Sequence, residues 1–126
     1  MAVATPADMP ATFARLFNAR DLGGLVGLYS DDAVLTLDGA AVARGHGEIE
    51  RMIVPLLSGP LQIAIHCATC HERGDVALVR SDWKLIGPDG AVAMAGASAE
   101  VLRRGADGRW RFVIDDACFA SRPHIG

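Results

Sequence analysis

The sequence predicts an α+β fold in which three N-terminal helices pack on the concave face of a strongly curved, mainly antiparallel sheet. Apolar residues recur at helical spacing up to residue 57, whereas long β-type runs follow Pro60 and are separated by the turn sequences ERGD, GPDG and GADG. The chain has 126 residues, of which 51% are hydrophobic, which is enough for a sizeable core. We therefore expect one domain over residues 1–126.

Charge and composition argue against several classes of protein. The formal net charge of −3 provides no positive field for nucleic acid or for an anionic membrane surface. No run of about 18 apolar residues could span a bilayer, and the N-terminus lacks the pattern of a signal peptide. We therefore expect a cytoplasmic protein whose three cysteines are reduced thiols.

The three expected helices follow from apolar stripes and start signals. The first begins near Asp8 or Pro10 and carries an apolar stripe of Met9, Phe13, Leu16 and Phe17. A second, short helix has Asp21 as its N-cap and an apolar face of Leu22, Leu25, Val26 and Tyr29. A third begins at Gly47, is bent by Pro55 and carries a stripe of Ile49, Met52, Ile53, Leu56 and Leu57.

The expected strands come in two groups. A short hairpin is predicted over residues 33–37 and 41–44, closed by the turn at Asp38 and Gly39. Four longer antiparallel strands are predicted over residues 61–71, 76–86, 91–104 and 110–118, with Gly96 as a bend point in the third. Their length favours a strongly bent sheet.

Four stretches in this order resemble the NTF2-like superfamily, in particular its SnoaL-like and ketosteroid-isomerase-like proteins. They are NARDLGGLVGLYSDDAVL from residue 18, RGHGEI from residue 44, GDVALVRSDWKLIG from residue 74 and DGRWRFVIDD from residue 107. The resemblance implies a cone-shaped fold with an opening at one end. It further implies a small apolar molecule in the cone, no cofactor or metal, and a homodimer.

The resemblance does not extend to the catalytic residues of ketosteroid isomerases. Alignment places the tyrosine, the base and the protonated acid of that mechanism near Phe13, Leu37 and Ala97, none of which has suitable chemistry. Asp38 lies one residue past the base position, and a slip of one residue in a strand reverses the face. Steroid isomerisation by that mechanism is therefore not expected.

Asp115 is the predicted catalytic residue, because SnoaL-type cyclases use an aspartate that projects into the cavity from a C-terminal strand. Strict alternation would place Trp110, Phe112 and Ile114 on one face and Arg111, Val113, Asp115 and Ala117 on the other. The family's geometry suggests that the second face lines the cavity. There, desolvation would raise the pKa of Asp115. The alternative is that Asp115 caps a helix or pairs with an arginine.

The expected ligand-binding residues are aromatic or long apolar side chains. Trp83 shares an inward face with Ala77, Val79, Ser81 and Leu85, and its large ring suits either a ligand wall or a simple core. The resemblance adds further lining candidates: Phe13, Phe17, Tyr29, Met52 and Leu56.

An outward stripe is the expected dimer surface, because the convex face of this superfamily commonly packs against a second copy. Its members are Arg80, Asp82, Lys84, Glu100 and Arg104. An ordinary solvated face is the alternative. Two functions therefore remain open: a cofactor-free isomerase or cyclase with Asp115 as proton carrier, and a non-catalytic module for ligand binding or dimerisation.

The segment HCATCH, residues 66–71, contains the C-x-x-C-H spacing that attaches haem or, loosely, holds zinc. It lies within a predicted strand, where side chains three positions apart point in opposite directions. Cys67 and Cys70 are then expected on opposite faces, Cys67 with His71 and Cys70 with His66. A jointly bound metal is therefore not expected.

Overall fold

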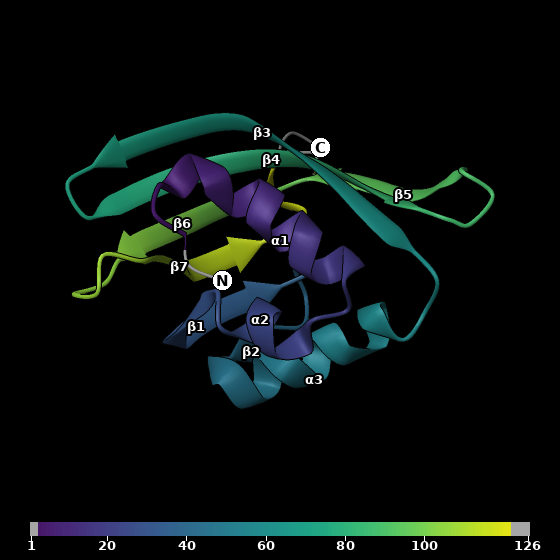
Figure 1. The fold of residues 1–126 in the computed structure, drawn as a ribbon, viewed down its shortest axis with the longest axis horizontal. Coiled ribbons are helices and arrows are strands. Elements are labelled where there is room, and N and C mark those ends of the chain that lie inside the picture. Colours follow the sequence, from purple (N-terminus) through teal and green to yellow (C-terminus); the bar gives the residue numbers. More distant parts are fainter. Residues whose placement is uncertain (1–2, 122–126) are drawn as a thin grey trace.

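The structure is a computed structural model that describes residues 3–121 (Figure 1). The chain begins with a 3-10 turn, η1, and ends with another, η2. The elements in order are η1 (Pro6–Asp8), α1 (Met9–Asn18), α2 (Leu22–Val26), β1 (Tyr29–Thr36), β2 (Ala43–Arg44), α3 (Gly45–Leu57), β3 (Gln62–Arg73), β4 (Val76–Ile86), β5 (Val92–Ala97), β6 (Ala99–Arg104), β7 (Trp110–Asp116) and η2 (Phe119–Ser121).

All strands of the described residues join one mixed, mostly antiparallel sheet. Its order is β2-β1-β7-β6-β4-β3, with β5 paired to β4 beside this path. The pair β1 and β7 is parallel, and every other pair is antiparallel. The expected α+β cone is confirmed: α1 lies across the face of the long strands, whereas α2 and α3 lie towards β1 (Figure 1).

The strand expected over residues 91–104 is divided at Ser98 into β5 and β6. Both pieces pair with β4, β5 with its second half and β6 with its first half. The break therefore lies two residues after Gly96, the expected bend point. The break allows the chain to change direction and to follow the curvature of the sheet along both halves of β4.

Polar contacts at the end of α1 hold this helix against β3. The Asn18 side chain accepts from the Ile63 N–H at 2.8 Å and donates to the Ile63 carbonyl at 3.0 Å. Arg20 donates to the carbonyls of Gly59 and Leu61 at 2.8 and 2.6 Å. The predicted cap of α2 is confirmed, because the Asp21 carboxylate accepts from the Gly24 N–H at 2.8 Å.

The predicted faces of β4 are confirmed, but those of β3 are wrong. Cys67 lies opposite Ser81 and Thr69 opposite Arg80, so Ala68 is the extra residue of a β-bulge. Cys70 lies opposite Val79, which shares the inner face with Ser81, and both cysteines pack against the core. Cys67 and Cys70 therefore share one face. Nevertheless, no group of three or more His, Cys, Asp or Glu side chains within residues 3–121 could hold a metal ion.

Candidate active site in the cone

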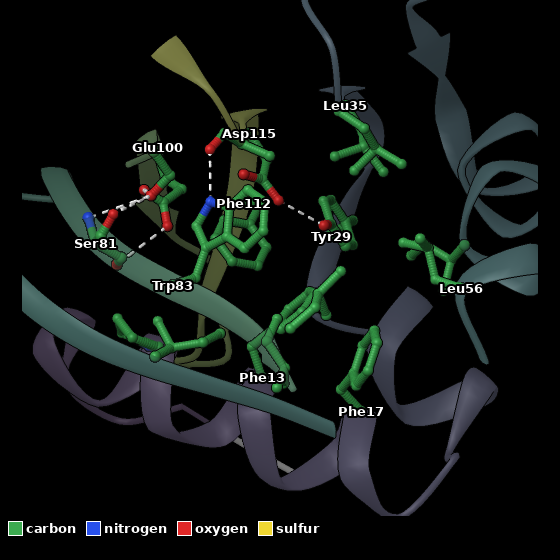
Figure 2. Close-up of a pocket in the computed structure, with 18 of the residues that line it drawn as sticks. Phe13, Phe17, Tyr29, Leu35, Leu56, Ser81, Trp83, Glu100, Phe112 and Asp115 are labelled. Carbon is green, nitrogen blue, oxygen red and sulfur yellow. Dashed lines mark hydrogen bonds between the residues drawn. The ribbon is translucent and has the colours of Figure 1, made fainter. Parts of the chain in front are cut away.

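The cone contains a pocket with a cavity volume of about 130 Å³. It lies between α1, α3 and the inner face of the sheet, and its wall is almost entirely apolar (Figure 2). The lining residues are Pro10, Phe13, Phe17, Tyr29, Leu35, Leu37, Ile53, Leu56, Ile63, Ile65, Ser81, Trp83, Leu85, Met94, Ser98, Glu100, Phe112, Asp115 and Ala117. The polar groups converge at one part of this wall.

Asp115 and Tyr29 form the first polar contact of the pocket. The Tyr29 hydroxyl donates to Asp115 Oδ2 at 2.6 Å, and the two residues are 1% and 8% exposed (Figure 2). The sequence placed Tyr29 in the second helix, which is wrong. Tyr29 is the first residue of β1. The strongly buried hydroxyl therefore has the partner it needs.

A bulge in β7 brings Asp115 to the pocket. Leu102 lies opposite Phe112 and Val101 opposite Ile114, so Val113 is the extra residue. Phe112 and Asp115 consequently face the pocket together, although they are three positions apart. Asp115 therefore lies in the lining of the pocket, where the family's geometry suggested it would be. The strict alternation expected for this strand is wrong, because Phe112 was expected on the opposite face.

Glu100 is the second buried carboxyl of the pocket, with 6% of its surface exposed. Its Oε2 lies 2.6 Å from Ser98 Oγ, and its Oε1 lies 3.4 Å from Ser81 Oγ. The sequence placed Glu100 in the outward stripe, which is wrong. Glu100 lies directly opposite Asp115 and shares its face with buried Leu102. Because β5 ends before Ser98 and β6 begins after it, the alternation of inward and outward side chains in β5 does not continue into β6.

The electrostatics of the two carboxyls follow from burial. Desolvation raises the pKa of Asp115 to about 6, although the Tyr29 hydrogen bond opposes this shift. Desolvation, followed by the charge of Asp115, raises the pKa of Glu100 to about 8. Burial, followed by the charge of Asp115, likewise raises the pKa of Tyr29. At pH 7 the pair therefore carries mainly one negative charge, and the Tyr29 hydrogen bond favours its place on Asp115.

Trp83 forms one wall between these carboxyls and the helices (Figure 2). Its indole N–H donates to the Ala117 carbonyl at 2.7 Å. A Cβ atom added at Gly96 would lie only 2.5 Å from the Trp83 ring. The missing side chain of Gly96 therefore makes room for the indole, whose N–H donor is already occupied.

The predicted lining residues are mostly brought together. Phe13, Phe17, Tyr29, Leu56 and Trp83 line the pocket, but Met52 does not and packs against the core instead. Met52 lies one turn before Leu56 on the same stripe of α3. Sharing a helical stripe therefore did not ensure contact with the pocket.

The three positions aligned with the catalytic residues of ketosteroid isomerases are apolar residues in apolar surroundings. Phe13 and Leu37 line the pocket, whereas Ala97 is buried outside the lining. Asp38 is exposed in the turn after β1, where its carboxylate accepts from the N–H groups of Ala40 and Ala41. It therefore takes no part in the pocket.

Sequence reasoning missed Glu100, Ser98 and Ser81 as polar members of the site. Val101 and Leu102 are both apolar, so alternation in this stretch did not decide which face Glu100 takes. One signal was present: Glu100 is the only charged residue between Asp89 and Arg103. A lone carboxyl in an apolar run is a candidate for burial.

The SnoaL-like domain family matches residues 11–113 of the chain, and the protein therefore belongs to this family. The family match and the cone together place it in the NTF2-like superfamily. A search of curated proteins gave no match. None of the helices within residues 3–121 is long and apolar enough to cross a membrane.

Solved structures with the same fold share little sequence with this chain. An NTF2-like protein with a cystatin-like fold from Novosphingobium aromaticivorans is 21% identical, with a TM-score of 0.80 over 94% of this chain and 81% of that one. A candidate calcium/calmodulin-dependent protein kinase type II association domain from Thiobacillus denitrificans is 22% identical, with a TM-score of 0.79 over 94% and 97%. A ketosteroid isomerase-like protein from Erwinia carotovora atroseptica is 23% identical, with a TM-score of 0.69 over 89% and 92%.

Proposed function

We propose that the protein binds a small apolar molecule in the cone and that Asp115 carries a proton in isomerase- or cyclase-type acid/base chemistry. The observation that carries this proposal is a carboxyl group on the wall of an apolar pocket, 8% exposed and bonded to Tyr29. Burial raises the pKa of Asp115 to about 6. Near neutral pH, such a group accepts a proton as carboxylate and returns it as acid.

The size of the pocket limits the ligand. The cavity volume of about 130 Å³ is close to that of an engineered apolar cavity of about 150 Å³ that binds benzene. A ligand of about one six-membered ring therefore fits without rearrangement. Phe13, Phe17 and Phe112 contribute aromatic rings to its lining.

The test has two stages. Single-ring compounds are first screened by quenching of tryptophan fluorescence, because Trp83 lines the pocket. Compounds that bind are then incubated in D₂O, and mass spectrometry measures deuterium uptake at carbon. Wild-type protein is expected to speed this uptake and Asp115→Asn to lose most of the effect. Equal uptake with both proteins, at equal thermal stability, would remove the catalytic role of Asp115.

A non-catalytic ligand-binding or dimerisation module is the alternative, and the outer face of β4 favours dimerisation. Leu78 is 50% exposed there, beside the charged side chains of Arg80, Asp82 and Lys84. One structural neighbour is named as an association domain. We propose a twofold homodimer across this face, in which the opposite charges of the two copies pair.

Sedimentation equilibrium tests the dimer. Leu78→Glu is expected to yield monomer, because it places a negative charge from each copy at the apolar centre of the interface. Val54→Glu is the matched control, since Val54 is 42% exposed on α3, away from the sheet. A wild-type monomer at high micromolar concentration would reject the dimer.

A further inference from the structure

The hydrogen-bond donors around the pocket are already used within the protein. The Trp83 N–H donates to the Ala117 carbonyl, and the Tyr29 hydroxyl donates to Asp115 Oδ2. Ser98 Oγ accepts from the Ser81 N–H at 3.2 Å and donates to Glu100 Oε2 at 2.6 Å. A ligand that needs a hydrogen bond from the wall therefore finds few donors.

The acceptors, in contrast, are turned towards the pocket. Asp115 Oδ1 has no hydrogen-bond partner among residues 3–121, although its residue is only 8% exposed. No fully buried side-chain polar atom in that range lacks a partner, so Oδ1 must reach the space of the pocket. It is an unpartnered oxygen in an almost fully buried side chain.

Glu100 presents a second acceptor beside the first. The Ser98 hydroxyl donates to its Oε2 at 2.6 Å, so that oxygen already has one partner. The remaining oxygen, Oε1, has only the long 3.4 Å contact from Ser81 Oγ. Both carboxyls thus offer oxygen atoms to a donor.

Among the described residues, the ionisable groups around this pair are all acids, and none of them is a cation. The titratable groups that act on Glu100 or respond to it come from three strands: Asp115 on β7, Tyr29 on β1 and Cys67 on β3. None of the described residues that line the pocket is Lys, Arg or His. An anionic ligand would meet the Asp115 carboxylate without a compensating cation, whereas a cation would be attracted.

We propose that Asp115 and Glu100 bind the protonated amino group of an otherwise apolar molecule about one six-membered ring in size. An ammonium group has three N–H donors and no acceptor, which matches a wall with two acceptor oxygens and few free donors. The two carboxyls offset the cost of burying its charge, and the aromatic faces of Phe112 and Trp83 add cation–π attraction.

This inference rests on the proposed function only in requiring a small apolar molecule in the cone, and it does not depend on catalysis. Placing an ammonium beside Glu100 favours the ionised form of that carboxyl. Because the pKa of Glu100 is raised to about 8 in the free pocket, binding at pH 7 should release a proton. Amine binding therefore has a signature that binding of a neutral molecule lacks.

Isothermal titration calorimetry with benzylamine, benzyl alcohol and benzoate tests the proposal, because these probes share one ring and differ in charge. At pH 7 benzylamine is expected to bind at least about tenfold more tightly than benzyl alcohol, and benzoate least tightly. Repeating the titration in two buffers of different ionisation enthalpy counts the protons released. Between half a proton and one proton, roughly, is expected for benzylamine and none for benzyl alcohol.

Glu100→Gln keeps the size of the side chain and removes its charge. It should weaken benzylamine binding by about tenfold and abolish proton release. The affinity for benzyl alcohol should stay within about twofold of the wild-type value. Glu50→Gln, on the exposed face of α3, is the matched control and should change neither. Should Glu100→Gln fail to fold, Asp115→Asn provides the second variant, and the wild-type comparison needs no variant.

The other outcomes each decide the question. Benzyl alcohol binding as tightly as benzylamine overturns the amine proposal and leaves the proposed function intact. Tighter benzylamine binding without proton release places the amine away from Glu100 and overturns the assigned site. If none of the three probes binds, the small apolar ligand of the proposed function fails as well.

Discussion

Glu100 and Asp115 lie directly opposite each other on the antiparallel strands β6 and β7, and both side chains face the apolar pocket. Residues opposed in this way have Cβ atoms about 5 Å apart, so two like charges there repel strongly in a buried setting. The protein therefore holds a proton on one of them near neutral pH. Tyr29 selects Asp115 as the ionised member by donating its hydroxyl to it.

The stability of the protein should fall as the pH rises from about 4 to 8. Burial raises the folded-state pKa of Asp115 to about 6 and of Glu100 to about 8, so the folded protein binds more protons than the unfolded chain in this window. In urea unfolding, the unfolding free energy of Glu100→Gln relative to that of wild type should rise by on the order of 3 kcal/mol between pH 5 and 9. Parallel curves for the two proteins would contradict the raised pKa, and Glu50→Gln serves as the control.

Tyr29→Phe removes the hydroxyl that stabilises the Asp115 carboxylate. Because this hydrogen bond lowers the pKa of Asp115, its loss should raise that pKa above about 6. It should also cost about 1–3 kcal/mol of unfolding free energy, as expected when a buried charged group loses its partner. Carboxyl NMR titration and urea unfolding measure the two effects. Ser30→Ala removes a neighbouring hydroxyl that donates to Asp32 instead, and should shift neither.

Gly96→Ala should displace the indole of Trp83. The new Cβ atom would lie 2.5 Å from the ring, so either Trp83 or β5 must move, at a cost of about 1–3 kcal/mol. The hydrogen bond from Trp83 to Ala117 would lengthen, and the fluorescence maximum should shift to longer wavelength as the indole gains contact with water. Gly59→Ala, with no atom within 4 Å of the new Cβ, should leave stability and emission close to wild type. Equal effects of the two substitutions would show that Gly96 makes no close contact in solution.

Leu56→Trp should close the pocket from the α3 side. Leu56 lines the cavity and is half-buried, so a larger ring can occupy the ligand space without displacing the core. Affinity for single-ring probes such as benzylamine is expected to fall by at least about tenfold, as measured by calorimetry. Met52→Trp is the matched control one turn earlier, outside the lining. If Met52→Trp weakened binding as much, the pocket would extend further along α3 than the structure shows.

The parts of the fold that depend on periodicity could be predicted from the sequence. The helices, the cap at Asp21 and the two faces of β4 follow from local spacing, and the NTF2-like cone followed from the order of four segments. Trp83 was placed by the alternation of its strand, and Phe13 and Phe17 by the family resemblance, and all three line the pocket.

The parts that depend on register could not be predicted. A bulge adds one residue and reverses the faces beyond it, and nothing in Ala68 or Val113 marks either residue as the extra one. These two bulges decide that Cys67 and Cys70 share a face and that Phe112 joins Asp115. The inward turn of Glu100 depends similarly on the break at Ser98, which is a tertiary feature of the curved sheet.

The pKa of Asp115 tests the central claim most directly. Carboxyl-carbon NMR on protein labelled at aspartate would follow this group from pH 3 to 9, with Asp115→Asn used to assign the signal. The burial and pairing described above predict a midpoint near 6 for Asp115, with a further small shift near pH 8 as Glu100 ionises. A single midpoint near 4, the ordinary value for an exposed aspartate, would mean that the carboxyl is solvated and that the proposed proton carrier does not exist.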